Sequence, residues 1–207
     1  MNFNLDDALS YNKADLLDMN SRLESYPKLL SEGWEQSKSI DLPPSYSGVS
    51  KILIHGMGGS AISGDLLLNV LNREAPEIEV FVHRDYDLPG WVGNDTLVIS
   101  SSHSGETEEV LSGIEIGQKN MTKMLAMTSG GTLEKQYLKH GLPVFLLPEA
   151  GPPRTLFPFV VGLLCGILDT LALANFSKQF GKTNLEIDEL QQSLDRNTPS
   201  VSNKAKT

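Results

Sequence analysis

The sequence predicts an α/β fold in which a doubly wound, five-stranded parallel sheet has helices on both faces. Five short apolar segments are spaced along residues 51–148, with helix-like segments between most of them. This alternation is typical of βαβ units. The apolar segments lack a clean polar–apolar alternation, as expected of strands covered on both faces. Two of them are followed by glycine- and serine-rich stretches, at the strand ends where such sheets bind ligands.

Each element follows from a local pattern. Leucine and methionine residues at roughly helical spacing predict an N-terminal helix to about residue 38, ended by DLPPSYSGVS. Between two strands, GMGGSAISG is expected to be a turn and DLLLNVLNR a helix. The strands are expected at 51–55, 77–85, 95–101, 122–128 and 142–148, and the later helices at 108–119, 132–140 and 182–195. The last residues, RNTPSVSNKAKT, are polar and are expected to be disordered or a linker.

A long apolar segment, residues 156–176, follows the last expected strand. It contains a G-x-x-x-G pair, Gly162 and Gly166, which also occurs in membrane helices. Pro158 and Asp169 interrupt the segment, and no second segment of this kind accompanies it. We therefore predict a buried helix of a domain core or subunit interface rather than a membrane span.

Composition narrows the classes of partner. The chain has 207 residues and a formal net charge of −9, which argues against a nucleic-acid or anionic-membrane partner. Its single cysteine, Cys165, cannot form a disulfide framework, and the N-terminus lacks an apolar signal core, so a cytoplasmic location is expected. The four histidines are scattered over different elements, and no metal site or cofactor is predicted. They are His55, His83, His103 and His140.

The stretch SSSHSGET, residues 100–107, is the most informative motif. Ser102, Ser104 and Thr107 stand in S-x-S-G-x-T spacing around Gly105, between an expected strand and an expected helix. Hydroxyls and free N–H groups at a helix start form an anion site suited to phosphate. The alternative is helix capping alone, which needs one hydroxyl and leaves the others unexplained.

The earlier stretch GMGGS, residues 56–60, has three interpretations. Gly56, Gly58 and Ala61 fit a loose dinucleotide-binding pattern, with Asp85 placed to contact a ribose. A tight strand-to-helix turn without a ligand would also use these glycines. The third interpretation is a sugar-phosphate site shared with the S-x-S-G-x-T loop. Its contacts would be Gly58, Gly59 and Ser60.

A third candidate lies in GPPRT, residues 151–155. Arg154 stands where a loop enters the long apolar segment. An arginine there can hold a phosphate or stabilise an oxyanion. The alternative is a surface ion pair with Glu149.

Together these motifs resemble the flavodoxin-like sugar isomerase (SIS) domain, and more narrowly the N-terminal half of the bifunctional phosphoglucose/phosphomannose isomerase family. The narrower resemblance rests on GMGGS-x-x-x-GD (residues 56–65), DYDLP (85–89) and the pair Pro153–Arg154. It covers roughly residues 50–174. The chain departs from the family pattern at His103, where tyrosine is usual, and at Glu106, where asparagine is usual.

The resemblance implies hexose 6-phosphate as ligand and isomerisation of glucose or mannose 6-phosphate to fructose 6-phosphate through a cis-enediol. Arg154 would stabilise the enediolate, and the family's base and ring-opening acid would lie in a second SIS domain absent from this chain. The chain alone is therefore expected to turn over poorly and to form a homodimer or pair with a second SIS domain. The implied phosphate ligands are Gly58, Gly59, Ser60, Ser102, Ser104 and Thr107.

The expected organisation is an N-terminal helical segment (1–45), an SIS domain (46–176), and a helix with a linker tail (177–207). The alternative function is a non-catalytic sugar-phosphate sensor. The acidic N-terminal segment, which lacks a basic face, argues against a sensor that reads DNA.

Overall fold

The computed structural model describes residues 4–7, 10–11, 14–148 and 153–206. Its centre is a five-stranded parallel sheet in the order β2-β1-β3-β4-β5. The strands are β1 Lys51–Gly56, β2 Glu79–His83, β3 Thr96–Ser101, β4 Lys123–Thr128 and β5 Val144–Leu146. This confirms the predicted parallel sheet, and it places β1 beside β3, so that the two glycine- and serine-rich stretches leave neighbouring strands.

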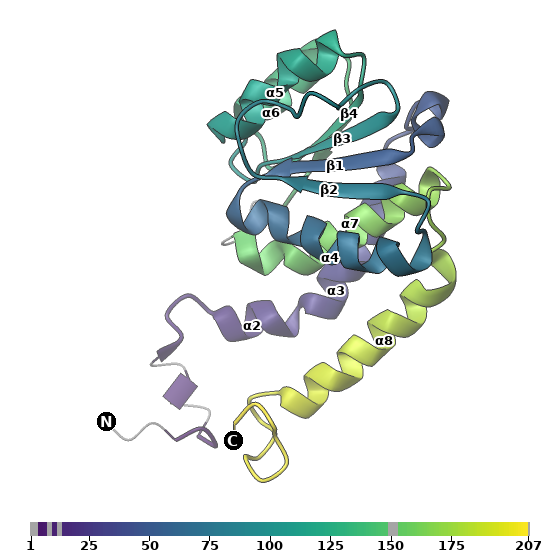
Figure 1. Cartoon of the computed structure of the whole chain (residues 1–207). Helices are drawn as coiled ribbons and strands as arrows, with labels where there is room; N and C mark the ends of the chain where they lie inside the picture. The colour runs from purple at the N-terminus through teal and green to yellow at the C-terminus, as the bar shows by residue number, and fades with distance from the viewer. Residues whose placement is uncertain (1–3, 8–9, 12–13, 149–152, 207) are drawn as a thin grey trace.

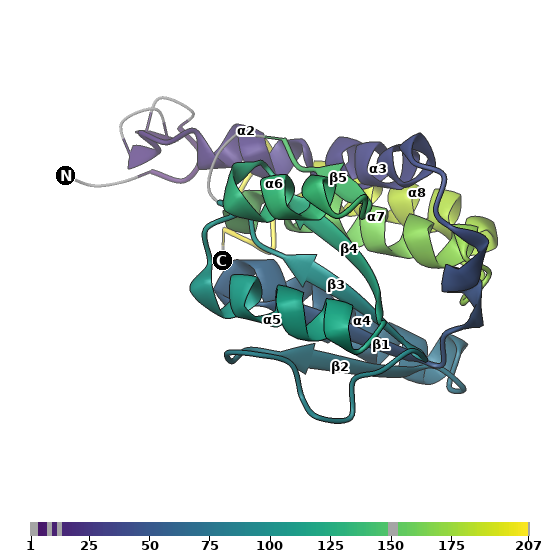
Figure 2. The same ribbon diagram turned by 90° about the horizontal axis from the view of Figure 1, so that it is seen from above.

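Helices cover both faces of the sheet (Figures 1 and 2). On one face lie α4 and α7, with α3 packed beside α7 near the β5 edge, and on the other face lie α5 and α6. The α-helices are α2 Met19–Glu24, α3 Tyr26–Gln36, α4 Gly58–Glu74, α5 Glu108–Lys119, α6 Gly131–Lys139, α7 Phe157–Thr170 and α8 Ser177–Leu194. Three 3₁₀ turns are η1 Ser37–Ser39, η2 Pro44–Gly48 and η3 Pro153–Leu156.

Each face of the sheet has its own apolar core. In β1, Ile52 and Ile54 pack in the cluster that includes α4 and α7, whereas Leu53 packs in the cluster that includes α5 and α6. Successive side chains of a strand point to opposite faces, so a strand covered on both sides needs apolar residues at every position. This explains why the strand segments showed no clean alternation.

The crossing of α3 and α7 is unusually close. A Cβ atom at Gly33 would lie 1.9 Å from the carbonyl oxygen of Phe159, and one at Gly162 would lie 2.0 Å from that of Leu30. At Gly166 an added Cβ would lie 2.2 Å from the hydroxyl oxygen of a serine in η1. The G-x-x-x-G pair therefore lets two helix backbones touch inside a core, as the buried-helix prediction required.

Several element boundaries differ from the predictions. The stretch expected to be a turn after β1 is already helical, because α4 begins at Gly58. The N-terminal helical segment is divided at Ser25 into α2 and α3. Between β2 and β3, where no helix was predicted, the chain forms a loop, and Leu88 and Val92 of this loop are buried in the core beside α5.

The C-terminal part of the chain is more ordered than expected. Helix α8 begins at Ser177 instead of residue 182. The following residues form turns, and Asn203, which is 1% exposed, donates a hydrogen bond to the carbonyl oxygen of Asp195. The backbone N–H of Ser200 donates to the carboxylate of Asp6. Residues 196–206 therefore have defined contacts with α8 and with Asp6, and their role as a linker remains a prediction. The domain boundaries remain a prediction.

Helix α7 is largely buried, and no helix in the described part of the chain is long and apolar enough to cross a membrane. One stripe of α7, including Val161 and Cys165, lines an apolar cavity of about 620 Å³ shared with α3, α4 and α8. Most of the apolar surface expected to bind a partner is thus covered within the chain. The homodimer remains a prediction.

Candidate functional site

The two predicted loops meet at the point where the direction of strand order reverses. From β1 the chain passes through α4 to β2 on one side, whereas β3 lies on the other side of β1. Ligands of open α/β sheets bind at such a switch point, beyond the carboxyl ends of the strands. The N-termini of α4 and α5 lie at this end, on the left in Figure 1, so two positive helix ends flank one location.

Ser60 links the loop after β1 to the loop after β3. Its backbone carbonyl accepts a hydrogen bond from the Ser101 hydroxyl at 3.0 Å, and its hydroxyl accepts one from the His103 N–H at 3.4 Å. Gly58 has a left-handed φ of 49° and, like Gly59, is exposed. Ser60 therefore joins the loop after β1 to the S-x-S-G-x-T loop, and Gly58 and Gly59 lie exposed just before it in the chain.

Hydrogen bonds within the S-x-S-G-x-T loop give it a defined shape. The hydroxyls of Ser102 and Thr107 lie 2.7 Å apart, and the N–H of Gly105 donates to the Ser102 hydroxyl at 3.1 Å. Ser102 is 1% exposed, whereas Ser104 is exposed and accepts a hydrogen bond from the Glu106 N–H at 3.2 Å. If the Ser102 hydroxyl donates to Thr107, the Thr107 proton stays free for an anion.

Neither helix start in these two loops has a side-chain cap. Thr107 is the N-cap residue of α5, yet its hydroxyl makes no cap hydrogen bond to the helix backbone. Met57, the N-cap of α4, has no side-chain cap hydrogen bond either. Helix capping alone therefore does not explain the three hydroxyls.

A third glycine-rich turn, TSGGT between β4 and α6, shapes the S-x-S-G-x-T loop and was not among the predicted site elements. The Ser129 N–H donates to the His103 carbonyl at 3.0 Å, and the Leu133 N–H donates to the Gly105 carbonyl at 2.9 Å. A Cβ atom at Gly105, whose φ is 70°, would lie 1.9 Å from the carbonyl oxygen of Gly130. The repeated Ser/Thr–Gly composition at a third strand end was the available signal.

Arg154 lies in η3 and is exposed, and η3 packs beside α4. Among the described residues Arg154 has no hydrogen-bond or ion-pair partner. The alternative partner Glu149 and most of GPPRT lie outside the described residues. The fold therefore places η3, which carries Arg154, in contact with α4, the helix that begins at Gly58.

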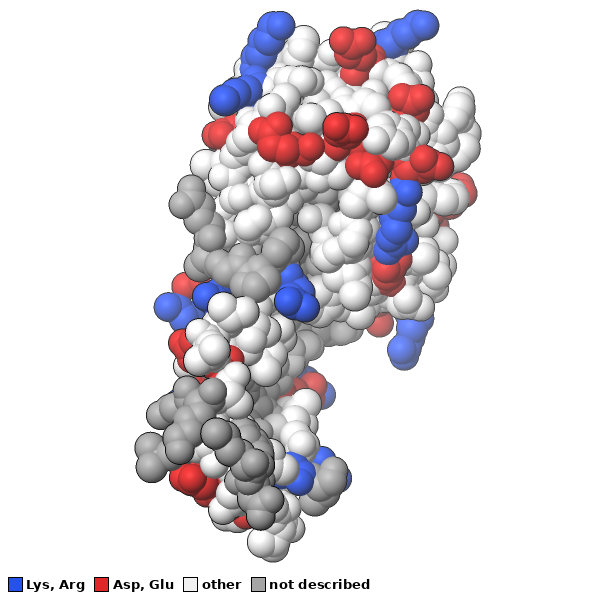
Figure 3. All heavy atoms as spheres, turned by 90° about the vertical axis from the view of Figure 1, so that its left-hand side faces the viewer, with Lys and Arg blue, Asp and Glu red and all other residues white. Residues whose placement is uncertain are grey.

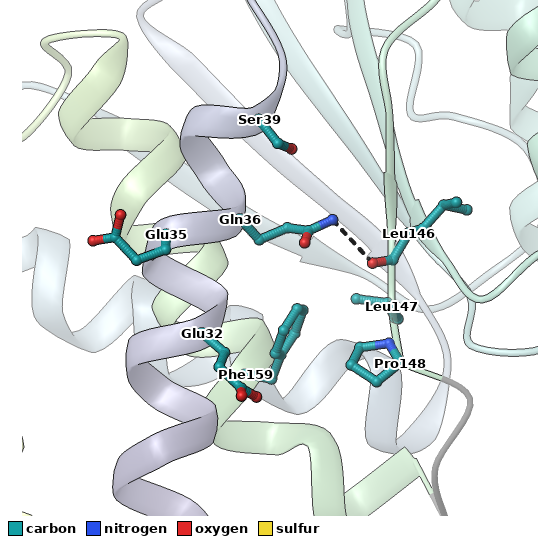
Figure 4. Close-up of a pocket in the computed structure, with 8 residues that line it drawn as sticks. All are labelled: Glu32, Glu35, Gln36, Ser39, Leu146, Leu147, Pro148 and Phe159. Atoms are coloured by element: carbon teal, nitrogen blue, oxygen red, sulfur yellow. Dashed lines mark hydrogen bonds between the residues drawn. The ribbon is translucent and has the colours of Figure 1, made fainter.

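A separate cavity of about 630 Å³ lies between α3 and the end of β5 (Figure 4). The Gln36 side chain reaches across it and donates a hydrogen bond to the Leu146 carbonyl at 3.2 Å. Glu32 and Glu35 also line this cavity, and neither predicted loop does. Its acidic, open lining is unsuited to a phosphate.

Acidic side chains gather in a band across the face where the strands end (Figure 3). Several carboxylates near the loops have partners. Asp65 pairs with Arg84, and Glu108 accepts a hydrogen bond from the Tyr86 hydroxyl at 3.2 Å. Glu106 is bonded to the start of α6. These partners limit the repulsion that a phosphate would meet.

His55 lies directly before the first loop and is fully buried. Its Nε2–H donates to the Asp85 carbonyl at 3.0 Å, while Nδ1 is buried without a hydrogen-bond partner in the described part of the chain. The pKa of His55 is lowered, and the largest cause is the burial of the imidazole. The His83 ring stands 5.0 Å away. The imidazole is therefore held neutral.

This buried histidine predicts a loss of stability in mild acid. Because the pKa of His55 is lower in the folded state, its contribution is complete above about pH 6.5 and declines as pH falls below that value. The slope should approach about 1.4 kcal/mol per pH unit. His55→Gln keeps a donor for Asp85 and should remove this slope in urea titrations. His140→Gln, at an exposed position, is the control; equal slopes in all three proteins would contradict the prediction.

The fold and the two joined loops define a class. The chain has the fold of the SIS phosphosugar isomerases: it matches a putative phosphosugar isomerase from Bacillus subtilis with a TM-score of 0.57 and 17% identity, over 82% of this chain and 52% of that one. No protein-family model matches the chain.

More narrowly, the chain is a homologue of the bifunctional phosphoglucose/phosphomannose isomerases. It is 33% identical to that of Caldicellulosiruptor bescii over 181 residues, which are 87% of this chain and 53% of the relative. It is 28% identical to that of Aquifex aeolicus over 184 residues, 89% of this chain and 54% of the relative. The chain spans about half the length of these curated relatives. The resemblance in the motifs is thereby confirmed; which half it represents remains a prediction.

Proposed function

We propose that the chain binds a hexose 6-phosphate at the β1–β3 switch point and supplies the phosphate-binding part of an aldose–ketose isomerase site. The observation that supports this most is the S-x-S-G-x-T loop, held beside the α4 N-terminus by Ser60. A phosphate there would meet hydroxyls and two positive helix ends together. The proposed ligands are Gly58, Gly59, Ser60, Ser102, Ser104 and Thr107.

In the proposed reaction glucose or mannose 6-phosphate is interconverted with fructose 6-phosphate. A proton moves between C2 and C1 of the same sugar, through a cis-enediol intermediate. Binding of the phosphate positions the reacting carbons. The Arg154 guanidinium would stabilise the negative oxygen of the enediolate. We assign no residue of this chain to the general base or the ring-opening acid, and we propose that the chain alone turns over poorly.

Ligand-dependent stabilisation tests the binding step. Fructose 6-phosphate and glucose 6-phosphate should raise the melting temperature. At a ligand concentration one hundred times the dissociation constant, the free energy of unfolding should increase by about 2.7 kcal/mol. Fructose should not, because it lacks the phosphate. Stabilisation by NAD alone would favour the dinucleotide interpretation and refute the sugar-phosphate proposal. An assay for glucose 6-phosphate formation should detect little turnover, and robust turnover would contradict the assignment of a partial catalytic set.

Ser102→Ala should weaken fructose 6-phosphate binding about tenfold, measured by isothermal titration calorimetry. The substitution removes the hydroxyl that bonds Thr107 and the Gly105 N–H, so both lose their position. The matched control is Ser193→Ala, because the Ser193 hydroxyl bonds only the Leu190 carbonyl of its own helix. Unchanged affinity in Ser102→Ala would count against this loop as the phosphate site.

A further inference from the structure

Glu106 belongs to the S-x-S-G-x-T loop, but its carboxylate is bonded to a different element. The backbone N–H of Thr132 donates to Oε1 at 2.8 Å, and the Thr132 hydroxyl donates to Oε2 at 2.8 Å and lies 3.1 Å from Oε1. Thr132 is the second residue of α6, so the carboxylate lies at the positive end of that helix. The carboxylate is therefore satisfied at α6, on the side of the turn after β4.

The surrounding backbone fits this contact closely. Gly131 has a left-handed φ of 80°, and a Cβ atom there would lie 2.5 Å from the Ser104 carbonyl oxygen and 2.8 Å from Glu106 Oε1. Backbone bonds join the same two segments at His103 and Gly105. The Glu106 side chain thus adds a charge-assisted contact, stronger than a neutral hydrogen bond, to a turn without room for other side chains.

The ionisation state of Glu106 matters for a neighbouring anion. Hydrogen bonds from the Thr132 side chain and then from its backbone N–H lower the pKa of the Glu106 carboxyl, and Lys135 contributes further. At neutral pH the loop therefore carries a full negative charge between Ser104 and Thr107. A carboxylate free to turn toward a bound phosphate dianion would weaken binding.

We propose that Glu106 is a positioning residue: through Thr132 it fixes the shape of the phosphate loop and keeps its own charge at α6, away from the ligand. This inference rests on the proposed function. Two properties of the Glu106 side chain can therefore be tested separately. Its hydrogen-bonding capacity holds the loop, whereas its negative charge opposes the phosphate. Glutamine keeps an acceptor for the Thr132 N–H and removes the charge, and alanine removes both.

The test is titration of fructose 6-phosphate into the full chain and its variants by calorimetry. Glu106→Ala should weaken binding about tenfold, the loss expected for about 1.4 kcal/mol. Glu106→Gln should bind as tightly as the unmodified chain or a few times more tightly, because the clamp remains and a repulsive charge is gone. Thr132→Val should fall between, because it loses the hydroxyl and keeps the backbone N–H. Glu115→Gln, an exposed charge change on α5, is the control and should leave affinity unchanged.

The outcomes separate this inference from the proposed function. If the unmodified chain does not bind fructose 6-phosphate, the proposed function fails and the role of Glu106 fails with it. If it binds and Glu106→Ala binds equally well, only the positioning role is overturned. Glutamine as weak as alanine would also overturn it, because a glutamine that keeps the clamp must rescue binding. Melting curves identify any variant that fails to fold; Glu106→Gln then still decides the question.

Discussion

Gly162→Ala is expected to lower the free energy of unfolding by about 3 kcal/mol, the upper end of the usual cost of overpacking a core. The new Cβ atom would lie 2.0 Å from the carbonyl oxygen of Leu30 and 3.0 Å from the backbone nitrogen of Trp34. Both are backbone atoms, so no side-chain rotation relieves the clash. Helix α3 must move away from α7, which loosens the core contacts of Trp34. Urea denaturation followed by far-UV circular dichroism measures the change.

Gly181→Ala is the matched control for this prediction. Gly181 lies within α8, and an added Cβ atom there meets nothing within 4 Å. Because alanine favours the helix over glycine, stability should rise by up to about 1 kcal/mol. Equal urea midpoints for Gly162→Ala and the unmodified chain would show that α3 and α7 do not touch through their backbones.

Gly105→Ala is expected to weaken fructose 6-phosphate binding about a hundredfold, equivalent to about 2.8 kcal/mol. The Cβ atom would lie 1.9 Å from the carbonyl oxygen of Gly130, and the φ of 70° disfavours any side chain. The phosphate loop must then separate from the turn after β4. Because the Gly105 N–H holds the Ser102 hydroxyl, the proposed ligands lose their arrangement together. Calorimetric titration measures the loss, which depends on the proposed function.

Gly141→Ala distinguishes the clash from backbone strain. Gly141 has a similar φ of 66°, but an added Cβ atom meets nothing within 4 Å. The substitution should cost about 1–2 kcal/mol of stability through the left-handed conformation and leave fructose 6-phosphate affinity unchanged. If Gly105→Ala binds as tightly as Gly141→Ala, the close contact with Gly130 does not shape the site.

Local patterns predicted elements well where sequence and packing agree. The helix expected at 108–119 is α5, Glu108–Lys119, because acidic residues begin it and its apolar residues recur at helical spacing. The prediction failed after β1, where Gly59 and Gly64 lie within α4 although glycine is a poor helix former. Close packing accounts for part of this: a Cβ atom at Gly64 would lie 3.0 Å from Ile54.

The candidate site was predictable in composition but only partly in its contacts. S-x-S-G-x-T spacing indicated an anion loop and its three hydroxyls. It could not reveal that Ser102 is buried or that Thr132 donates hydrogen bonds to Glu106. Thr132 and Glu106 are 26 residues apart in the sequence, and burial likewise depends on segments that are distant in the chain. Nor could the tail be predicted, because its buried Asn203 is polar and carries no hydrophobic signal.

The sequence by itself determined the parallel sheet and the position of the two loops, since short apolar segments and glycine–hydroxyl motifs are local properties of the chain. Only the tertiary structure decided that β1 and β3 are neighbours, that TSGGT supports the S-x-S-G-x-T loop, and that α3 and α7 meet backbone to backbone. These features depend on which distant segments lie together. Strand order and the absence of Cβ atoms at contact points fix that arrangement, and a linear pattern does not specify it.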